Sequence, residues 1–351
     1  MITSKVGFWI LGLVAITCTL MGMQLSHAPR LVTKPKPMPI VVPQGWPKPT
    51  YRFRDNPPTE AGFALGKVLF YDPILSRDSS VSCASCHLSY TAFAHTDHAL
   101  SHGIESRIGL RNAPTLANLA WGLRFMWDGA VHHLDFQALN PIAHPDEMDA
   151  SLPQVLARLR RLPQYQTRFA QTFGDTYITG ERMMKAFSQF LVQLVSANAK
   201  YDQVQRQDPG VAFTAQELSG QALFMTHCNS CHTAPLFTNN GFANNGLLPD
   251  SELKDWGRMT ITRKKADSLL FKVPNLRNIA LTPPYMHDGR FTSLSQVLKH
   301  YAKGIHQSPT LDPKLRKGLP LSPNEQIDIV AFLLTLTDHQ FAFNKRFEAP
   351  Q

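Results

Sequence analysis

The chain has 351 residues, which is enough for two ordinary domains but too few for a large multidomain array. Hydrophobic residues account for 43% of the chain and charged residues for 17%, a composition that can bury a core and excludes wholesale disorder. The net charge of +9 would suit an anionic partner, but no dense run of lysine and arginine accompanies it, so charge alone does not predict nucleic-acid binding.

The N-terminus has the pattern of an exported protein. Lys5 precedes a largely apolar run over residues 6–23. A positive start followed by an apolar segment of this length is typical of an export signal or of a single membrane anchor. We therefore predict a signal peptide or anchor over residues 1–28, and the sequence leaves both alternatives open. Cys18 is interpreted as an apolar residue of this segment.

A proline-rich segment comes next. Residues 29–50 contain seven prolines, and such a stretch is extended and semi-rigid, with no core of its own. We predict a linker that tethers the globular part to a membrane. The globular part is predicted to be mainly α-helical with long loops, because helical periodicity dominates and few strand patterns alternate. Its clearest helical segments are 152–169, 179–204, 215–227, 294–301 and 324–336.

Two cysteine motifs carry the chemistry. Both read C-x-x-C-H, the first formed by Cys83, Cys86 and His87 and the second by Cys228, Cys231 and His232. In each motif the two thiols can add to the vinyl groups of one haem, while the adjacent histidine binds the iron. One motif per domain predicts two covalently bound haems c, in an N-terminal haem domain over residues 51–207 and a C-terminal one over residues 208–345.

Other interpretations of the cysteines fit less well. A thioredoxin-like C-x-x-C would follow a strand, whereas helical or loop sequence precedes both motifs. A zinc site can use two C-x-x-C pairs, but it does not require a histidine directly after each pair. Two haems also bring four propionates, which offset about half of the net positive charge because carboxylates are ionised at neutral pH. Nucleic-acid binding is therefore not predicted.

Composition does not select the second ligand of either iron. A haem that only carries electrons usually has two protein ligands, whereas one that activates peroxide needs an open position with acid or base groups nearby. Most histidines are expected to be solvated loop residues. Candidates in the N-terminal domain are His95, His98, His102, His132, His133, His144 and Glu147, and those in the C-terminal domain are Met259, Met286, His287, His300 and Tyr301.

Three long segments resemble the bacterial di-haem cytochrome c peroxidase / MauG superfamily. They are LGKVLFYDPILSRDSSVSCASCH, GLRNAPTLANLAWGLRFMWDGAVHHLDFQALNPIAHPDEM and FKVPNLRNIALTPPYMHDGRFTSLSQVLKHY. They occur in the family's order around both haem motifs. The resemblance implies a periplasmic enzyme with two cytochrome c-like haem domains, in which the N-terminal haem reacts with peroxide and the C-terminal haem receives electrons.

Carried over by position, the resemblance implies roles for single residues. His87 and His232 match the proximal iron ligands. Trp127 matches the tryptophan that lies between the two haems and relays electrons. Glu147 matches the glutamate over the reactive haem, where a buried carboxylate can transfer a proton during cleavage of peroxide. Asp146 is the alternative if the alignment shifts by one residue.

Two histidines have less defined matches. His102 falls in a loop where some peroxidases place a histidine that blocks the reactive iron until the other haem is reduced. The competing prediction is an open or water-bound iron. His287 is expected near the haem interface, with a structural or proton-handling role.

The resemblance also implies a calcium ion between the haem domains. Asn112 matches its side-chain ligand, and Thr282 and Pro284 match its backbone-carbonyl donors. Neutral oxygens together with water suit calcium, which is a hard cation. The ion would fix the interface and Trp127.

Tyr301 departs from the well-studied peroxidases, which have a methionine at this position. It matches the MauG-like branch, in which the phenol binds the iron. An anionic oxygen ligand stabilises ferric iron and lowers the reduction potential. Met286 and His300 remain open as alternative ligands.

The sequence supports three functional hypotheses. The first is an exported di-haem peroxidase that reduces hydrogen peroxide to water with electrons from a small periplasmic donor, such as a cytochrome c or a cupredoxin. The second, motivated by Tyr301, is a MauG-like oxidase that oxidatively modifies residues of a partner protein. The third is an electron carrier without catalysis, against which Glu147 in its motif argues.

Overall fold

The structure is a computed structural model that describes Met1 and residues 34–350. The predicted signal or anchor, Cys18 and residues 29–33 lie outside the described residues. In chain order the helices are α1 (Glu60–Tyr71), α2 (Cys83–Cys86), α3 (Leu139–Ala143), α4 (Leu152–Arg161), α5 (Pro163–Phe173), α6 (Gly180–Leu191), α7 (Lys200–Gln205), α8 (Ala215–His227), α9 (Met259–Thr262), α10 (Leu294–Lys299), α11 (Pro323–Leu334) and α12 (His339–Ala342). The two short strands β1 (Phe242–Ala243) and β2 (Phe271–Lys272) pair antiparallel.

The mainly helical prediction is confirmed, but two predicted helices are divided. The segment 152–169 forms α4 and α5, because Leu162 adopts an extended conformation before Pro163, and proline starts the next helix. The segment 179–204 forms α6 and α7, separated by a stretch that is clamped by hydrogen bonds from Asn118. The predicted helix 215–227 matches α8.

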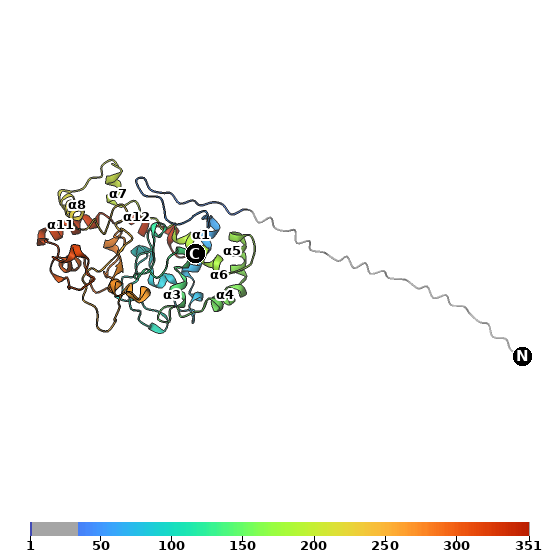
Figure 1. Cartoon of the computed structure of the whole chain (residues 1–351). Helices are drawn as coiled ribbons and strands as arrows, with labels where there is room; N and C mark the ends of the chain where they lie inside the picture. The colour runs from blue at the N-terminus through green and yellow to red at the C-terminus, as the bar shows by residue number, and fades with distance from the viewer. Residues whose placement is uncertain (2–33, 351) are drawn as a thin grey trace. The chain divides into compact units, whose positions relative to one another are not determined.

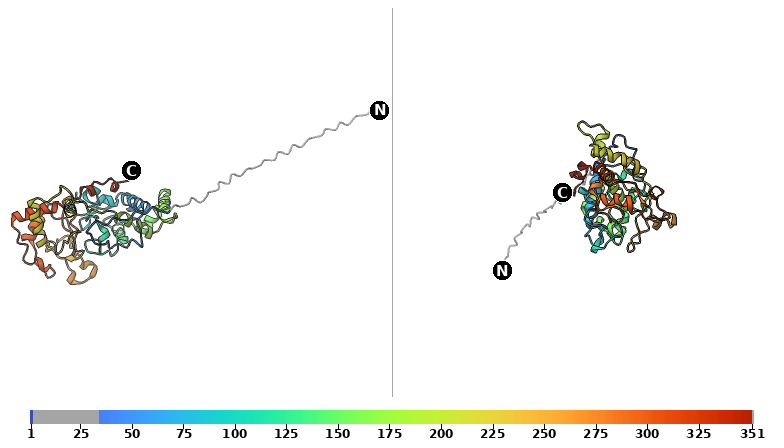
Figure 2. Two further views of the ribbon diagram at one scale, coloured as in Figure 1. Left: turned by 90° about the horizontal axis from the view of Figure 1, so that it is seen from above. Right: turned by 90° about the vertical axis from the view of Figure 1, so that its left-hand side faces the viewer.

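The described helices form two lobes, each built on one pair of crossing helices. In the first lobe α1 packs on α6, and in the second α8 packs on α11. A glycine allows each close approach: a Cβ atom on Gly66 would lie 2.0 Å from the Ala186 carbonyl oxygen, and one on Gly220 would lie 1.9 Å from the Asp328 carbonyl oxygen. Figure 1 shows α1, α5 and α6 grouped away from α8 and α11, and Figure 2 shows the same separation from other directions.

One loop geometry occurs twice, once in each half of the chain. Asn118 and Asn278 both adopt the left-handed conformation, at φ 64° and 62°. Eight residues later Met126 and Met286 do so again, and both are followed by Asp-Gly after one intervening residue. In this internal repeat Trp127 of the first half corresponds to His287 of the second. The sequence signal was present as Met-Trp-Asp-Gly and Met-His-Asp-Gly.

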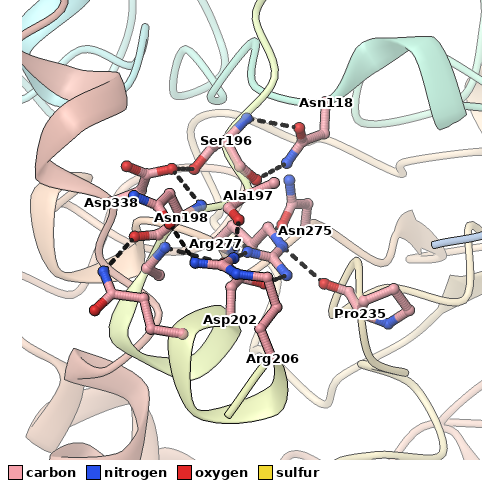
Figure 3. Close-up of polar contacts among 12 residues, drawn as sticks. Asn118, Ser196, Ala197, Asn198, Asp202, Arg206, Pro235, Asn275, Arg277 and Asp338 are labelled. Carbon is pink, nitrogen blue, oxygen red and sulfur yellow. Dashed lines mark hydrogen bonds and ion pairs between the residues drawn. The ribbon is translucent and has the colours of Figure 1, made fainter. Parts of the chain in front are cut away.

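A buried polar network joins the two halves (Figure 3). The Arg277 guanidinium donates two hydrogen bonds of 2.7 Å to the Asp202 carboxylate, and the two side chains are 0% and 6% exposed. Beside this pair, the Asn118 side chain bonds the Ser196 main chain at 2.9 and 3.1 Å. The Ser196 hydroxyl donates to Asp338 at 3.2 Å. Residues far apart in the sequence are therefore locked together at this junction.

The two ends of the described chain pack on the lobes. In the proline-rich segment Trp46 contacts Trp121 edge to face at 4.9 Å and lies 4.5 Å from the Arg277 guanidinium. At the other end Phe341 and Phe347 join the hydrophobic core of the first lobe. Met38, Ile40 and Trp46, which lie between the prolines, pack against the core of the first lobe. The linker itself stays a prediction.

Among the described residues, no helix is long and apolar enough to cross a membrane. The apolar run at 6–23 lies outside this part of the chain. The predicted domain boundaries at 51, 207 and 345 remain predictions.

Candidate functional site

The first C-x-x-C-H motif opens onto a cavity of about 430 Å³, which is lined mostly by the first half of the chain. Cys83 and Cys86 are the ends of the short helix α2, and His87 follows it. Cys86 and His87 line this first cavity. The volume is within the range of sites that enclose a cofactor-sized ligand.

His87 is oriented for coordination through one defined nitrogen. Its Nδ1 lies 2.8 Å from the Phe93 carbonyl oxygen, which can only accept a hydrogen bond. Nδ1 therefore carries the proton and Nε2 keeps its lone pair, the arrangement usual for a metal-binding histidine. Burial lowers the pKa of His87 to about 4, so the ring is neutral at pH 7.

The second motif opens onto a second cavity of about 530 Å³, lined by Cys228, Cys231 and His232. The His232 Nδ1 lies 3.1 Å from the carbonyl oxygens of both Phe237 and Pro274. The same tautomer follows, with Nε2 free to bind a metal.

These features fit two covalent haems. The four motif cysteines are free thiols, each motif adjoins a cavity, and each histidine presents an unprotonated nitrogen. Thiols can form the thioether bonds to a haem only if they are not paired in disulfides. Cys83, Cys86 and His87 would hold one haem, and Cys228, Cys231 and His232 the other.

The two cavities share one wall. Its members line both cavities: residues 112–115, Trp127, Lys272, Pro274 and Asn275. The Trp127 indole Nε1 donates to the Asn112 carbonyl oxygen at 2.9 Å, and the Asn112 N–H donates to the His287 carbonyl oxygen at 2.7 Å. The indole is therefore held in the wall between the two predicted haem sites.

Glu147 lines the first cavity together with His144, Asn140 and Gln137. Burial raises the pKa of the Glu147 carboxyl above its ordinary value, an effect that His144 partly offsets and Asp146 reinforces. A raised pKa makes the carboxylate a stronger base, so it accepts and holds a proton more readily than an exposed glutamate does. Asp146, the alternative residue, does not line this cavity.

The main chain of Glu147 is fixed by a loop next to the haem-attachment motif. The Ile104 N–H donates to the Glu147 carbonyl oxygen at 2.8 Å. Gly103 lies so close that a Cβ atom there would be 2.4 Å from that oxygen. The carbonyl of the preceding residue, His102, accepts a contact of 3.5 Å from the Cys86 sulfur. This loop thus links the position of Glu147 to that of Cys86.

The His102 side chain does not line the first cavity. Its ring stacks on His98 with centroids 4.2 Å apart and planes inclined by 4°. The structure therefore brings the His102 backbone, but not its imidazole, to the site.

Tyr301 and Met286 line the second cavity with His232, whereas His300 does not. Tyr301 lies on a π-helical turn, His300–Gly304, which continues α10, and such turns are frequent at functional sites. His300 is 6% exposed and its Nε2 is bound 3.0 Å from the Asn245 carbonyl oxygen. The Met286 sulfur accepts from the Asn245 side chain at 3.3 Å. Of the three candidates, the tyrosine and the methionine face this cavity.

The three predicted calcium ligands also line the second cavity: Asn112, Thr282 and Pro284. The Asn112 Nδ2 donates to the Ala99 carbonyl oxygen at 3.0 Å, an arrangement that leaves its side-chain oxygen available as an acceptor.

His287 is 8% exposed and lies beside this cavity. Its ring stacks on Phe271 with centroids 3.7 Å apart. Burial lowers the pKa of His287 to about 4. A neutral, stacked ring with a carbonyl bound to Asn112 suits a structural role at the interface.

Sequence reasoning missed Lys272 and Arg111. The Arg111 guanidinium bonds Asp128 at 2.6 Å and Asp255 at 2.6 and 2.9 Å, and so bridges the two halves next to the shared wall. Both cations lie inside the segments that carry the family resemblance, but only the three-dimensional structure reveals the partners of Arg111 and the place of Lys272 between the cavities.

Known proteins share this architecture. A family model described as di-haem cytochrome c peroxidase matches residues 60–210, and one for cytochrome c matches residues 218–337. The methylamine utilization protein MauG of Methylorubrum extorquens is 38% identical over 303 residues, which cover 84% of this chain and 82% of that protein. The cytochrome c551 peroxidase of Nitrosomonas europaea is 36% identical over 281 residues, covering 79% and 80%.

A crystal structure of a MauG-like protein associated with microbial copper homeostasis superposes with a TM-score of 0.78 at 30% identity, covering 88% of this chain and 98% of that one. The fold and the paired haem motifs thus define a di-haem c-type oxidoreductase that acts on peroxide. The chain belongs to the di-haem cytochrome c peroxidase / MauG family, in which peroxidases and MauG proteins match it at similar identity.

Proposed function

We propose that the protein is an exported peroxidase that reduces hydrogen peroxide to water in the periplasm, with electrons from a small donor such as a cytochrome c or a cupredoxin. The observation that carries this proposal is the placement of Glu147, a carboxyl with a raised pKa, in the cavity of the first haem motif. A pure electron carrier has no use for such a group.

The haems, when bound, supply the redox chemistry, since their irons exchange the electrons that peroxide reduction needs. The side chains supply binding and proton transfer. Glu147 takes a proton from peroxide at a carboxylate oxygen and returns it to the departing oxygen, which leaves as water. His144, lining the same cavity, is placed to exchange protons between Glu147 and solvent.

The two sites have different tasks in this proposal. The haem held by Cys228, Cys231 and His232 would receive electrons from the donor, and the Trp127 indole, in the shared wall, would lie between this haem and the first. Calcium, held by Asn112, Thr282 and Pro284, would stiffen this wall. Because the His102 ring is stacked on His98, we expect the first iron to be open to peroxide without prior reduction.

A second candidate function is oxidation of residues on a partner protein. Tyr301 favours it, because the phenol lines the second cavity and an oxygen ligand stabilises higher oxidation states of iron. Tyrosine at this position does not identify a protein substrate.

The test compares both functions in one preparation. The purified holoprotein is mixed with stoichiometric peroxide and then with reduced cytochrome c or reduced cupredoxin, and donor oxidation is followed by absorbance. Rapid catalytic oxidation of either donor supports the peroxidase. Negligible donor oxidation, together with cross-linking of a co-purifying protein, would replace it by the oxidase.

The ligand assignment has a separate test. Tyr301→Phe should change the absorption and EPR spectra of the second haem and leave those of the first unchanged. Tyr285→Phe is the matched control, because Tyr285 lines the same cavity and donates its hydroxyl to the Ile279 carbonyl at 3.0 Å. If Tyr301→Phe leaves both spectra unaltered, Met286 becomes the candidate ligand.

A further inference from the structure

A lysine, Lys272, lies in the wall between the two cavities. Among the described residues that line both cavities, Lys272 alone carries an ionisable side chain. A cation at this position faces both predicted haem sites at once, and it has no counterpart in the first half, because the equivalent position of the internal repeat is Asn112.

Lys272 has no acidic partner within the described part of the chain. The neighbouring cations do: Arg111 pairs with Asp128 and Asp255, and Arg277 pairs with Asp202. Burial lowers the pKa of Lys272 to about 8, and no nearby carboxylate opposes the shift. Lys272 is half-buried, and a charge withdrawn from water is normally compensated by an opposite charge. The described residues supply no such charge to this ammonium, so the site has room for an external anion.

Main-chain hydrogen bonds hold the backbone of Lys272 in place, which limits the positions that its ammonium group can occupy. The Lys272 N–H donates to the Trp127 carbonyl oxygen at 2.7 Å, and Lys272 pairs with Phe242 in the β1–β2 ladder. Its neighbour Phe271 stacks on His287. Phe271 lines only the second of the two cavities, whereas Lys272 lines both, as expected when successive side chains of a strand point in different directions.

We propose that Lys272 is the cationic partner of a haem propionate in the shared wall. The inference rests on the haem sites of the proposed function. A propionate is a carboxylate that must accompany each haem, and an ammonium–carboxylate hydrogen bond is strong in a poorly hydrated wall. Neutralising a negative charge near an iron favours its reduced state, so Lys272 would raise the reduction potential of the haem whose propionate it binds.

The test uses the holoprotein with both haems attached. Lys272→Met removes the charge and keeps much of the length, and Lys272→Arg restores a cation. Lys265→Met and Lys317→Met are matched controls, because both lysines are exposed and neither lines a cavity. Covalent haem content verifies the haem sites independently. The readouts are the midpoint potential of each haem by spectroelectrochemical titration and the propionate bending band in resonance Raman spectra.

We expect Lys272→Met to lower the potential of at least one haem and to shift the propionate band, while Lys272→Arg and both controls stay near the parent values. The haem whose midpoint potential falls is the one whose propionate binds Lys272. Unchanged potentials and an unchanged band in Lys272→Met would overturn the proposal. A lower potential with an unmoved band would overturn it as well, since the lysine would then act on the iron only through space. Loss of one haem in the parent protein would instead contradict the proposed function.

Discussion

The two cavities share the same kind of haem-attachment motif, but they are lined by different side chains. In both, a C-x-x-C-H histidine binds a backbone carbonyl through Nδ1 and keeps Nε2 free. The first cavity is lined by Glu147 and His144, which can move protons, and the second by Tyr301 and Met286, which can bind a metal. The contrast fits the proposal that the first cavity reacts with peroxide and that the second holds an iron with a second protein ligand.

The internal repeat shows how this division arises on one scaffold. At equivalent positions the halves carry Trp127 and His287, and Asn112 and Lys272. The left-handed turns at Asn118 and Met126 recur at Asn278 and Met286, so different side chains are carried at matching places of the two copies. The four residues meet at the interface, where main-chain hydrogen bonds join Asn112 to His287 and Lys272 to Trp127.

The most direct test of the difference between the two cavities is to remove the proton-transfer group from the first. Glu147→Gln should slow the reaction with peroxide by about 10²–10⁴-fold, the usual contribution of a general acid–base group, while both haems remain attached. Stopped-flow absorbance measures the rate. Glu181→Gln is the control, since Glu181 is exposed on α6 of the first lobe and does not line the cavity. A parent-like rate in Glu147→Gln would show that Glu147 does not act as the acid–base group of the first cavity.

The next largest effect concerns what holds the two halves together. Arg277→Met leaves the Asp202 carboxylate buried without its partner and should reduce the free energy of unfolding by about 3–5 kcal/mol. Denaturant titration followed by circular dichroism measures the change. Arg54→Met is the matched control, because its ion pair with Asp55 is exposed and lies outside the network, and it should contribute about 0–1 kcal/mol. Equal effects of the two substitutions would contradict the importance of the network in Figure 3.

A smaller effect compares the helix crossings of the two lobes. Gly66→Ala and Gly220→Ala each force a methyl group against a carbonyl oxygen and should cost about 1–3 kcal/mol. Because the junction network and the chain ends tie the lobes together, we expect one unfolding transition that shifts in both variants. Two transitions, of which each variant shifts only one, would show that the lobes unfold independently.

The smallest effect is a pH dependence confined to the first cavity. Glu147 accepts a proton only when ionised, and its raised pKa moves the loss of this form to higher pH than for an ordinary glutamate. The rate with peroxide should therefore fall about tenfold per pH unit below that pKa, and Glu147→Gln should lack this limb. A parent profile that is flat down to the pKa of an exposed glutamate would contradict the assignment.

Local sequence predicted the helices well where capping and periodicity agree. Thr214 and Glu217 form a capping box at the start of α8, which the sequence pattern identifies to the residue. The prediction was wrong where one helical pattern continued across Pro163, because two amphipathic helices in succession share the same periodicity. The docking of Trp46 on Trp121 and Arg277 was not predictable, since composition reports the prolines but not their neighbours' contacts.

The sequence by itself determined the chemistry of the haem attachments, because covalent binding requires two thiols and a histidine at fixed, contiguous spacing. The family resemblance added Trp127, Glu147 and Tyr301 as candidates. Only the tertiary structure decided that Trp127 and Lys272 share one wall, that Glu147 rather than Asp146 lines the first cavity, and that the His102 ring points to His98 instead. These residues are far apart in the sequence. Packing and long-range hydrogen bonds bring them together, and no local sequence pattern encodes those contacts.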